Sequence, residues 1–186
     1  MTPVFVIEHL EPKLYQWCRL EYAHISSFVG KRNLLFTNTK SAVLKKFGKV
    51  ELKSVKKLRF EKACILDPEA KSTLTPEIAK KYNYFIFGGI LGDNPPRERT
   101  KEELTRYLPY PAYNLGKDQM STDTAVIVTK MIVDGKKLSE LKFQQGVEIK
   151  INAHEEVHLP YKYLLKNGKP LLALGIVDML RRQKAF

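Results

Sequence analysis

The sequence has few of the features that mark membrane or secreted proteins. No apolar run approaches the ~20 residues that a membrane-spanning helix needs. The apolar N-terminal stretch MTPVFVIEHLEP lacks a basic leader and contains Glu8, so we expect no signal peptide. The chain has only two cysteines, Cys18 and Cys64, each in an apolar neighbourhood, which argues against a disulfide framework and a cysteine metal site. We therefore expect a cytoplasmic protein with two buried, free thiols.

The chain also lacks low-complexity tracts, internal repeats and flexible linkers. Its 186 residues are 44% apolar and 28% charged, which suits one globular domain spanning residues 1–186. Strands are expected at 3–9, 33–38, 63–67, 84–90, near 112–115 and within 140–151. Helices are expected at 13–29, 41–47, 75–82, 97–108, 121–133 and 169–183. This alternation predicts an α/β fold with a parallel, doubly wound sheet.

Acidic residues are outnumbered by basic ones, and the excess is local. The net charge is +12, and the segment 31–62 holds eleven basic residues and two acidic ones, a balance of +9. The eleven are Lys31, Arg32, Lys40, Lys45, Lys46, Lys49, Lys53, Lys56, Lys57, Arg59 and Lys62. Such a field favours docking on phosphate, as in ribosomal RNA, or on an acidic surface. A solvated, lysine-rich face explains the same pattern, so both interpretations stay open.

Residues 154–158, HEEVH, match the zinc-protease signature H-E-x-x-H. Zinc binding by this motif needs His154 and His158 on one face of a helix, one turn apart. Alternating apolar residues precede the motif, and Pro160 biases Leu159 towards extended conformations. No third histidine is nearby. The context therefore indicates the end of a strand and a loop, and we expect no metal.

Two glycine-containing loops carry more information. FGGILGDNPPRERT, residues 87–100, places glycines where a buried strand ends, and LGKDQMSTDTAVIVTK, residues 115–130, repeats that arrangement before a helix. Ligands of open α/β sheets bind at the carboxyl ends of strands, where glycine allows close approach to the backbone. Neither loop is a dinucleotide fingerprint or a P-loop, and Ser121 and Thr122 also suit a simple helix cap. Together the loops favour a nucleotide-like ligand held largely by backbone groups.

The same segments resemble a known family. F-G-G-I-L-G-D-N-P-P-R-E-R-T followed by L-G-K-D-Q-M-S-T-D-T-A is similar to the SPOUT methyltransferases, in the branch that includes a eukaryotic ribosomal-protein arginine methyltransferase and archaeal relatives described as predicted RNA methyltransferases. VIEHLEPKLYQWCRLEYAHI, CILDPEA, LPYKY and KPLLALGIVDML extend the resemblance over nearly the whole chain. Where HEEVH stands, the family has N-E-x-x-E, so His158 occupies the place of a usual glutamate.

The resemblance implies a fold and a cofactor. The fold would be a doubly wound parallel sheet with a deep trefoil knot near the C-terminus, a rare exception to the rule against threaded chains. S-adenosylmethionine would lie bent in the knot and leave as S-adenosylhomocysteine. The cofactor-binding residues implied are Leu66, Asp67, Phe87, Gly88, Gly89, Ile90, Leu91, Gly92, Leu115, Gly116, Gln119, Met120, Ser121, Thr122 and Thr124.

The resemblance also implies methyl transfer to an arginine of a ribosomal or ribosome-associated protein. A guanidinium is cationic, with a pKa above about 12, so carboxylates are the natural groups to bind and polarise it. Asp93, Glu155 and Glu8 are the candidates for the catalytic role. If RNA is the acceptor instead, Arg97 and Arg99 would bind substrate phosphate, unless they only pair with acids at the start of the next helix.

Two further interpretations remain beside the protein methyltransferase. One is an RNA methyltransferase of the SPOUT class, acting on ribosomal or transfer RNA, which the basic segment 31–62 would suit. The other is a non-catalytic RNA-binding module that keeps the fold. Intact cofactor loops argue against the non-catalytic module, because a module without catalysis does not need to bind a cofactor.

Overall fold

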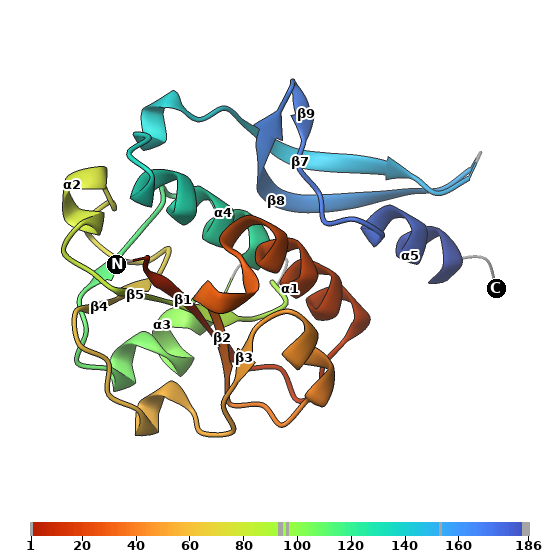
Figure 1. Ribbon diagram of the computed structural model, residues 1–186. Helices are drawn as coiled ribbons and strands as arrows, with labels where there is room; N and C mark the ends of the chain where they lie inside the picture. Colours follow the sequence, from red (N-terminus) through yellow and green to blue (C-terminus); the bar gives the residue numbers. More distant parts are fainter. Residues whose placement is uncertain (1, 93–94, 96, 153, 184–186) are drawn as a thin grey trace.

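The computed structural model describes residues 2–92, 95, 97–152 and 154–183. Its centre is a six-stranded, wholly parallel sheet with the strand order β3-β2-β1-β5-β4-β6 (Figure 1). The strands are β1 (Val4–His9), β2 (Leu34–Thr37), β3 (Lys49–Val50), β4 (Ala63–Leu66), β5 (Tyr84–Gly89) and β6 (Ala112–Tyr113). The predicted α/β fold with a parallel sheet is confirmed. The trefoil knot stays a prediction.

Helical segments cover both faces of this sheet, because successive side chains along each strand point to opposite sides. Phe5 and Ile7 of β1 pack into one apolar cluster, and Val6 between them packs into another. The first cluster lies beneath α1 (Gln16–Val29), α2 (Pro76–Ala79) and α4 (Thr122–Val133). The second lies beneath the 3₁₀ turn η3 (Val55–Lys57), α3 (Arg99–Glu103) and η4 (Thr105–Tyr107). The sheet is therefore doubly wound.

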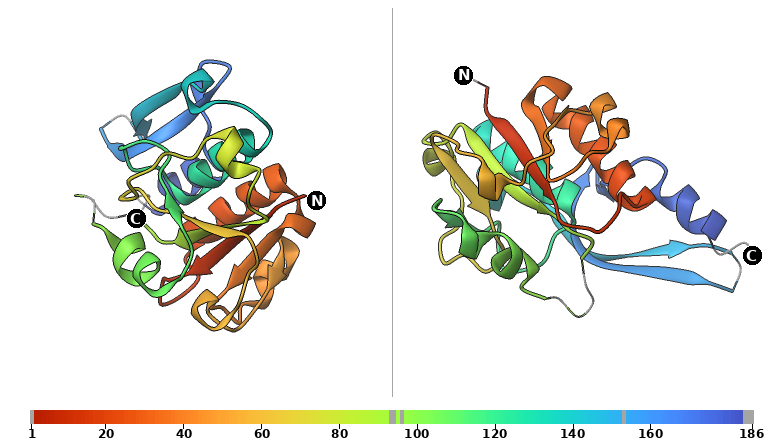
Figure 2. Two further views of the ribbon diagram at one scale, coloured as in Figure 1. Left: turned by 90° about the vertical axis from the view of Figure 1, so that its left-hand side faces the viewer. Right: turned by 90° about the horizontal axis from the view of Figure 1, so that it is seen from below.

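A second, antiparallel sheet follows α4 in the chain. It comprises β7 (Phe143–Lys150), β8 (Glu156–Lys166) and β9 (Lys169–Pro170), and it is followed by α5 (Ile176–Gln183). Figure 2 shows this hairpin extending beside α5 away from the parallel sheet. Apolar residues of β7, β8 and α5 form a third cluster, against which Trp17 of α1 packs. The hairpin therefore stands over the first turn of α1.

Several expected elements differ from those observed. The helix expected over 169–183 begins only at Ile176, because Lys169–Pro170 pair with β8 and the backbone of Gly175 has a φ of 89°. That prediction was wrong for 169–175. The helix expected over 97–108 is divided into α3 and η4, and the one at 41–47 is a 3₁₀ segment, η2 (Ala42–Lys46). Two more 3₁₀ turns, η1 (Lys31–Asn33) and η5 (Leu138–Glu140), link the elements.

The two cysteines are both buried and free, as predicted. Within the described part of the chain, every helix is too short or too polar to cross a bilayer. That the chain forms one domain stays a prediction.

Candidate active site

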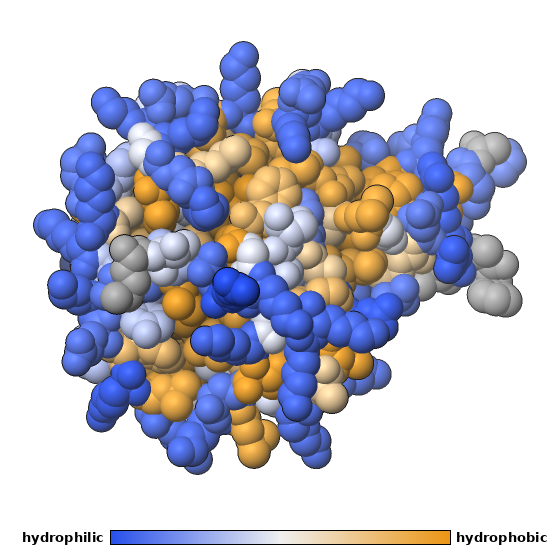
Figure 3. All heavy atoms as spheres, in the orientation of Figure 1, coloured by the Kyte–Doolittle hydropathy of each residue, from blue (hydrophilic) through white to orange (hydrophobic). Residues whose placement is uncertain are grey.

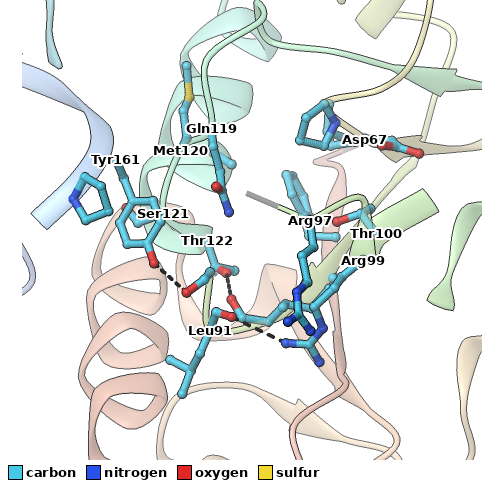
Figure 4. A pocket seen from close by; sticks show the side chains of 18 of the residues that line it. Asp67, Leu91, Arg97, Arg99, Thr100, Gln119, Met120, Ser121, Thr122 and Tyr161 are labelled. Carbon is cyan, nitrogen blue, oxygen red and sulfur yellow. Dashed lines mark hydrogen bonds between the residues drawn. The ribbon is translucent and has the colours of Figure 1, made fainter. Parts of the chain in front are cut away.

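A cavity of about 650 Å³ opens at the carboxyl ends of β4 and β5. It lies between the loop after β5, the segment 117–122 before and at the start of α4, and the strand β8. Figure 4 shows Gln119 pointing into it, with Tyr161 on one side and Arg97 on the other. A cavity of this size falls in the range of roughly 300–1,000 Å³ typical of small-molecule sites.

The parallel register of the sheet places this cavity. Ile65 of β4 is level with Ile86 of β5, so both strands end at the same edge and their loops diverge around a common space. Glycine at position 92 keeps that space open, because a Cβ there would lie 2.6 Å from the Tyr161 ring and 2.8 Å from the amide nitrogen of Gln119. The loop can approach these side chains only without a side chain of its own.

An acid remote in sequence holds the loop after β5 in place. Glu11 accepts hydrogen bonds at Oε1 from the backbone N–H of Leu91 and from Arg99 Nη1, both at 2.9 Å. Arg99 also donates from Nε to Glu103 at 2.7 Å. Arg99 therefore ties the loop to α3 and to the segment after β1.

The far side of the same loop is bound to β8 and α4. The Tyr161 hydroxyl donates to the carbonyl of Gly92 at 2.6 Å, and Thr122 Oγ1 donates to the carbonyl of Ile90 at 3.3 Å. Lys162 N donates to the carbonyl of Gln119 at 2.8 Å. The walls of the cavity are thus connected to one another by hydrogen bonds rather than by packing alone.

The N-terminus of α4 is organised around Asp123. Its Oδ1 lies 2.6 Å from Ser121 Oγ and accepts from the backbone N–H of Thr124 at 2.8 Å. Its Oδ2 lies 2.7 Å from Nδ1 of His24 on α1. The acid stands where the helix leaves N–H groups free and where the macrodipole favours negative charge.

Most of the expected cofactor-binding residues lie together at this site. The cavity is lined by Leu66, Asp67, Phe87, Gly88, Ile90, Leu91, Gly92, Gln119, Met120, Ser121 and Thr122. Leu115 and Gly116 line a smaller cavity of about 50 Å³, which shares Leu66, Asp67 and Met120 with the larger one. Gly89 and Thr124 line neither of these cavities. A Cβ on Gly89 would meet the Tyr22 hydroxyl at 2.4 Å, so this glycine faces the core.

Two of the three expected catalytic carboxylates, Glu155 and Glu8, do not line the cavity. Asp93 lies outside the described residues. Glu155 is exposed in the β7–β8 loop, where Asn152 Nδ2 donates to its Oε2 at 3.1 Å. Glu8 is buried, and hydrogen bonds from Thr37, Ser54 and the Val55 backbone hold its carboxylate against η3. Neither Glu155 nor Glu8 lines the cavity, so the structure gives no support for their catalytic role.

The two expected substrate-binding arginines both line the cavity but differ in their partners. Arg99 is held by Glu11 and by Glu103, so the helix-start ion pair considered as the alternative is present. Arg97 is exposed and makes no ion pair with a described carboxylate. Of the two, Arg97 is the one available to a ligand.

Sequence reasoning missed an acid that does line the cavity. Glu21 is 3% exposed and accepts a hydrogen bond at Oε1 from Trp17 Nε1 at 3.0 Å. Burial foremost, and then the charge of Asp123, raise the pKa of Glu21 well above its usual value, although the bond from Trp17 acts in the opposite direction. The sequence contained a signal for this residue, namely an acid on the apolar face of a helix. Glu21 lies one helical turn from Cys18 and next to Tyr22.

The HEEVH motif does not form a zinc-protease site. His154 lies in the β7–β8 loop and His158 in β8, so the helix that the motif needs is missing. The expected loop is present at 154–155, but residues 156–158 begin the strand β8, which was not expected. His158 Nδ1 lies 2.5 Å from Glu148 Oε1 on β7. Among the described residues, no group of three His, Cys, Asp or Glu is arranged to hold a metal ion.

The basic segment 31–62 contains β2 and β3 at one edge of the parallel sheet and runs on to the start of β4, and it is exposed at every one of its eleven lysines and arginines. None of these eleven makes an ion pair with a described carboxylate. Lys56 instead stands 4.0 Å from the ring centroid of Tyr107. Figure 3 shows hydrophilic side chains along most of the rim of the face in view. The charge is thus open to an anionic partner.

Comparison with known proteins gives one consistent result. The profile of a family described as "Protein arginine N-methyltransferase SFM1-like" matches residues 4–185. The protein arginine N-methyltransferase SFM1 of Saccharomyces cerevisiae is 36% identical over 203 residues, covering 97% of this chain and 95% of the yeast protein.

Solved structures agree with the sequence match. The crystal structure of yeast SFM1 complexed with SAM superposes with a TM-score of 0.90 at 36% identity, covering 100% of this chain and 93% of that one. The complex of the yeast protein with SAH gives a TM-score of 0.87, with 95% of this chain and 94% of that one covered. A Trm10 structure from Thermococcus kodakaraensis shares the fold alone, with a TM-score of 0.56 at 18% identity over 74% of this chain and 96% of that one.

Proposed function

Because the chain belongs to the SFM1-like family of protein arginine N-methyltransferases, we propose that it transfers a methyl group from S-adenosylmethionine to an arginine of a ribosomal or ribosome-associated protein. The observation that carries the proposal is the cavity between the β5 loop and α4, in a chain that matches a SAM-complexed relative over its whole length. When bound, S-adenosylmethionine supplies a methyl group on a sulfonium, and S-adenosylhomocysteine is left behind.

The residues of the cavity fit such a cofactor. Leu66, Phe87 and Met120 offer apolar walls for an adenine ring and a thioether, and Gln119 offers an amide. The glycine at position 92 allows the ligand to approach the backbone, as nucleotide-like ligands require at the ends of parallel strands. We propose that the loop residues lining the two cavities hold the cofactor.

The protein's own contribution to catalysis would be position and exclusion of water. Methyl transfer requires the accepting nitrogen within about 3–3.5 Å of the methyl carbon and in line with the bond that breaks. The hydrogen bonds from Tyr161 to Gly92 and from Leu91 to Glu11 keep the loop fixed while the substrate arginine enters. The walls therefore need little rearrangement when the reactants meet.

A ribosomal substrate would account for the basic segment 31–62. Its eleven exposed cations make no ion pair with the described carboxylates, so they can displace counterions from ribosomal RNA when the enzyme reaches its protein target. The partner proposed is thus a protein that lies beside RNA, and the compartment proposed is the cytoplasm. Arg97, at the mouth of the cavity, would contact neighbouring phosphate or an acidic residue of the substrate.

Comparison of cells with and without the protein tests this function. Intact masses of all ribosomal proteins would be measured in the wild type, in a strain lacking the gene, and in that strain carrying the gene again. We expect one protein to become lighter by one methyl group in the deletion strain, and fragmentation to place that group on an arginine. An unchanged set of ribosomal proteins together with the loss of a methylated nucleotide would establish the RNA methyltransferase instead.

A further inference from the structure

Four described carboxylates line the cavity, and they differ in what already binds them. They are Glu21, Asp67, Glu69 and Glu98. Asp67 is buried but uses both oxygens to hold a backbone N–H and a threonine hydroxyl. Glu98 is paired with a lysine at 2.6 Å, and Glu69 is exposed. Among the described residues, Glu21 and Asp67 are both buried and make no ion pair, but Asp67 is hydrogen-bonded at each oxygen, whereas the hydrogen bond of Glu21 is the one from Trp17 at Oε1.

The surroundings of Glu21 leave its charge uncompensated. Asp123 on α4 adds a second negative charge, and its own ion-pair partner is His24. Cys18 and Tyr22 on α1 and Tyr163 on β8 also face it, and none of them is a cation. Burial foremost, together with the charge of Glu21, raises the pKa of Cys18 to about 12, so this thiol stays neutral. A buried carboxylate in this position is stable in its charged form only beside a cation that enters from the cavity.

The groups around the carboxylate suit a planar cation. Trp17 and Tyr161 line the same cavity, and aromatic faces attract guanidinium groups. The indole N–H of Trp17 fixes Oε1 of Glu21 and prevents the side chain from turning away. A carboxylate, an indole and a phenol around one space are the elements of a guanidinium site.

We propose that Glu21 binds the guanidinium of the substrate arginine and accepts its proton during methyl transfer. This inference rests on the proposed function and names the residue that performs its acid–base step. The accepting nitrogen forms a bond to the methyl carbon while the carbon–sulfur bond breaks and its electron pair stays on sulfur. One N–H proton passes from that nitrogen to the carboxylate of Glu21. The product keeps a single positive charge as a methylguanidinium, and the proton later leaves to solvent.

The single tryptophan of the chain provides a direct test. Trp17 touches Glu21, so its fluorescence reports the occupancy and ionisation of that carboxylate. Glu21→Gln, Glu21→Asp and the control Asp134→Asn, which changes an exposed acid at the end of α4, would each be saturated with S-adenosylhomocysteine. N-acetylarginine amide and its neutral isostere N-acetylcitrulline amide would then be titrated. Affinity for S-adenosylhomocysteine, and the rate at which each variant methylates ribosomal subunits with S-adenosylmethionine at a series of pH values, would be measured on separate, ligand-free preparations of the same variants.

We expect Glu21→Gln to bind S-adenosylhomocysteine as the wild type does, to lose the fluorescence response to the arginine compound, and to turn over at least about 100-fold more slowly, as when a general base is removed. The wild-type rate should fall as pH falls through the pKa of Glu21. Glu21→Asp should recover part of the rate with a shifted profile, and Asp134→Asn should match the wild type.

Three results overturn the assignment, and they are distinguishable. If the wild type makes methylarginine and Glu21→Gln makes it as fast with the same pH profile, Glu21 has no such role while the proposed function stands. If the wild type binds S-adenosylhomocysteine but makes no methylarginine, the proposed function fails and the role of Glu21 fails with it. An equal fluorescence response to the arginine and citrulline compounds also contradicts the guanidinium site.

Discussion

Removing the hydroxyl group from two tyrosines of one strand should change the free energy of unfolding in opposite directions. Tyr161 and Tyr163 lie on β8 with ring centroids 6.5 Å apart. The hydroxyl of Tyr161 donates to the Gly92 carbonyl at 2.6 Å, whereas that of Tyr163 is buried and has no hydrogen-bond partner among the described residues. Burial foremost, and then the negative charges of Asp123 and Glu21, raise the pKa of Tyr163, so its proton stays on the hydroxyl. Tyr163→Phe therefore removes an unsatisfied donor, and Tyr161→Phe removes a satisfied one.

The magnitudes follow from these environments. A buried polar group without a partner costs about 1–3 kcal/mol, so Tyr163→Phe should raise the free energy of unfolding by about that amount. An ordinary hydrogen bond contributes about 0.5–1.5 kcal/mol, so Tyr161→Phe should lower it by about that much. For a chain of this length each kcal/mol shifts Tm by about 2–4 °C. Because the lost bond of Tyr161 also holds the loop, affinity for S-adenosylhomocysteine should fall by up to about tenfold.

Thermal and urea denaturation of the two variants, with calorimetric titration of S-adenosylhomocysteine, measures both effects. The matched pair controls for the loss of one oxygen from the same strand. A loss of stability in Tyr163→Phe equal to that in Tyr161→Phe would refute the reasoning, because it would mean that both hydroxyls are satisfied. Unchanged cofactor affinity in Tyr161→Phe would show that its bond does not hold the Gly92 loop.

Further predictions concern the loop, the buried acid and the basic surface. Gly92→Ala places a methyl group against Tyr161 and should abolish calorimetric binding of S-adenosylhomocysteine without unfolding the protein; retained binding contradicts our placement of the cavity. Glu11→Ala removes the acceptor that ties Leu91 to Arg99 and leaves Arg99 with Glu103 alone of its two carboxylates, so affinity for S-adenosylhomocysteine should fall at least about tenfold, a loss of about 1.4 kcal/mol. The pKa of Glu21 is raised in the folded state. The stability that this carboxyl group contributes is therefore present below pH 4.5 and is lost as pH rises from there through the folded-state pKa. Over this pH range the Tm of Glu21→Gln should increase relative to that of the wild type. The double substitution Lys45→Glu and Lys46→Glu should lower the affinity for ribosomal subunits, measured by co-sedimentation, and reduce the dependence of that affinity on salt. Binding as strong as that of the wild type would favour the interpretation that segment 31–62 is only a solvated surface.

The parallel sheet was predictable because its strands have simple patterns. β5 is a continuous apolar run, as a strand buried on both faces must be, and each strand is followed by an amphipathic or polar segment. The carboxyl ends of such strands are where ligands bind, so the glycines of 87–92 indicated the cavity correctly. These features depend on local sequence alone.

The strand β8 was missed because of Pro160, which removes a backbone donor. The register between β7 and β8 shifts between Gln145 and Val147, and the irregularity includes Gly146 with a φ of 70°. A bulge of this kind accommodates a proline inside a sheet. Gln145 Nε2 donates to the carbonyl of Pro160 at 2.7 Å, which further ties the two strands together. Only the pairing partner makes this strand recognisable.

The acids of the site were predicted least well, because their roles depend on contacts between distant segments. Glu8 matched the family pattern, yet Thr37 and Ser54, remote in sequence, turn its carboxylate away from the cavity. Glu11 gains its function only from the loop eighty residues later, at Leu91. Glu21 could have been suspected as a charge on an apolar helix face, but its position in the cavity depends on how α1 packs against α4.

The central claim is most directly tested with S-adenosylmethionine labelled in its methyl group. The protein would be incubated with ribosomal subunits from cells that lack it, and the labelled product divided into samples digested with protease or with nuclease. The account predicts that the label follows the protein and appears as methylarginine after acid hydrolysis. Label that stays with the nucleotides would contradict it and make the protein an RNA methyltransferase.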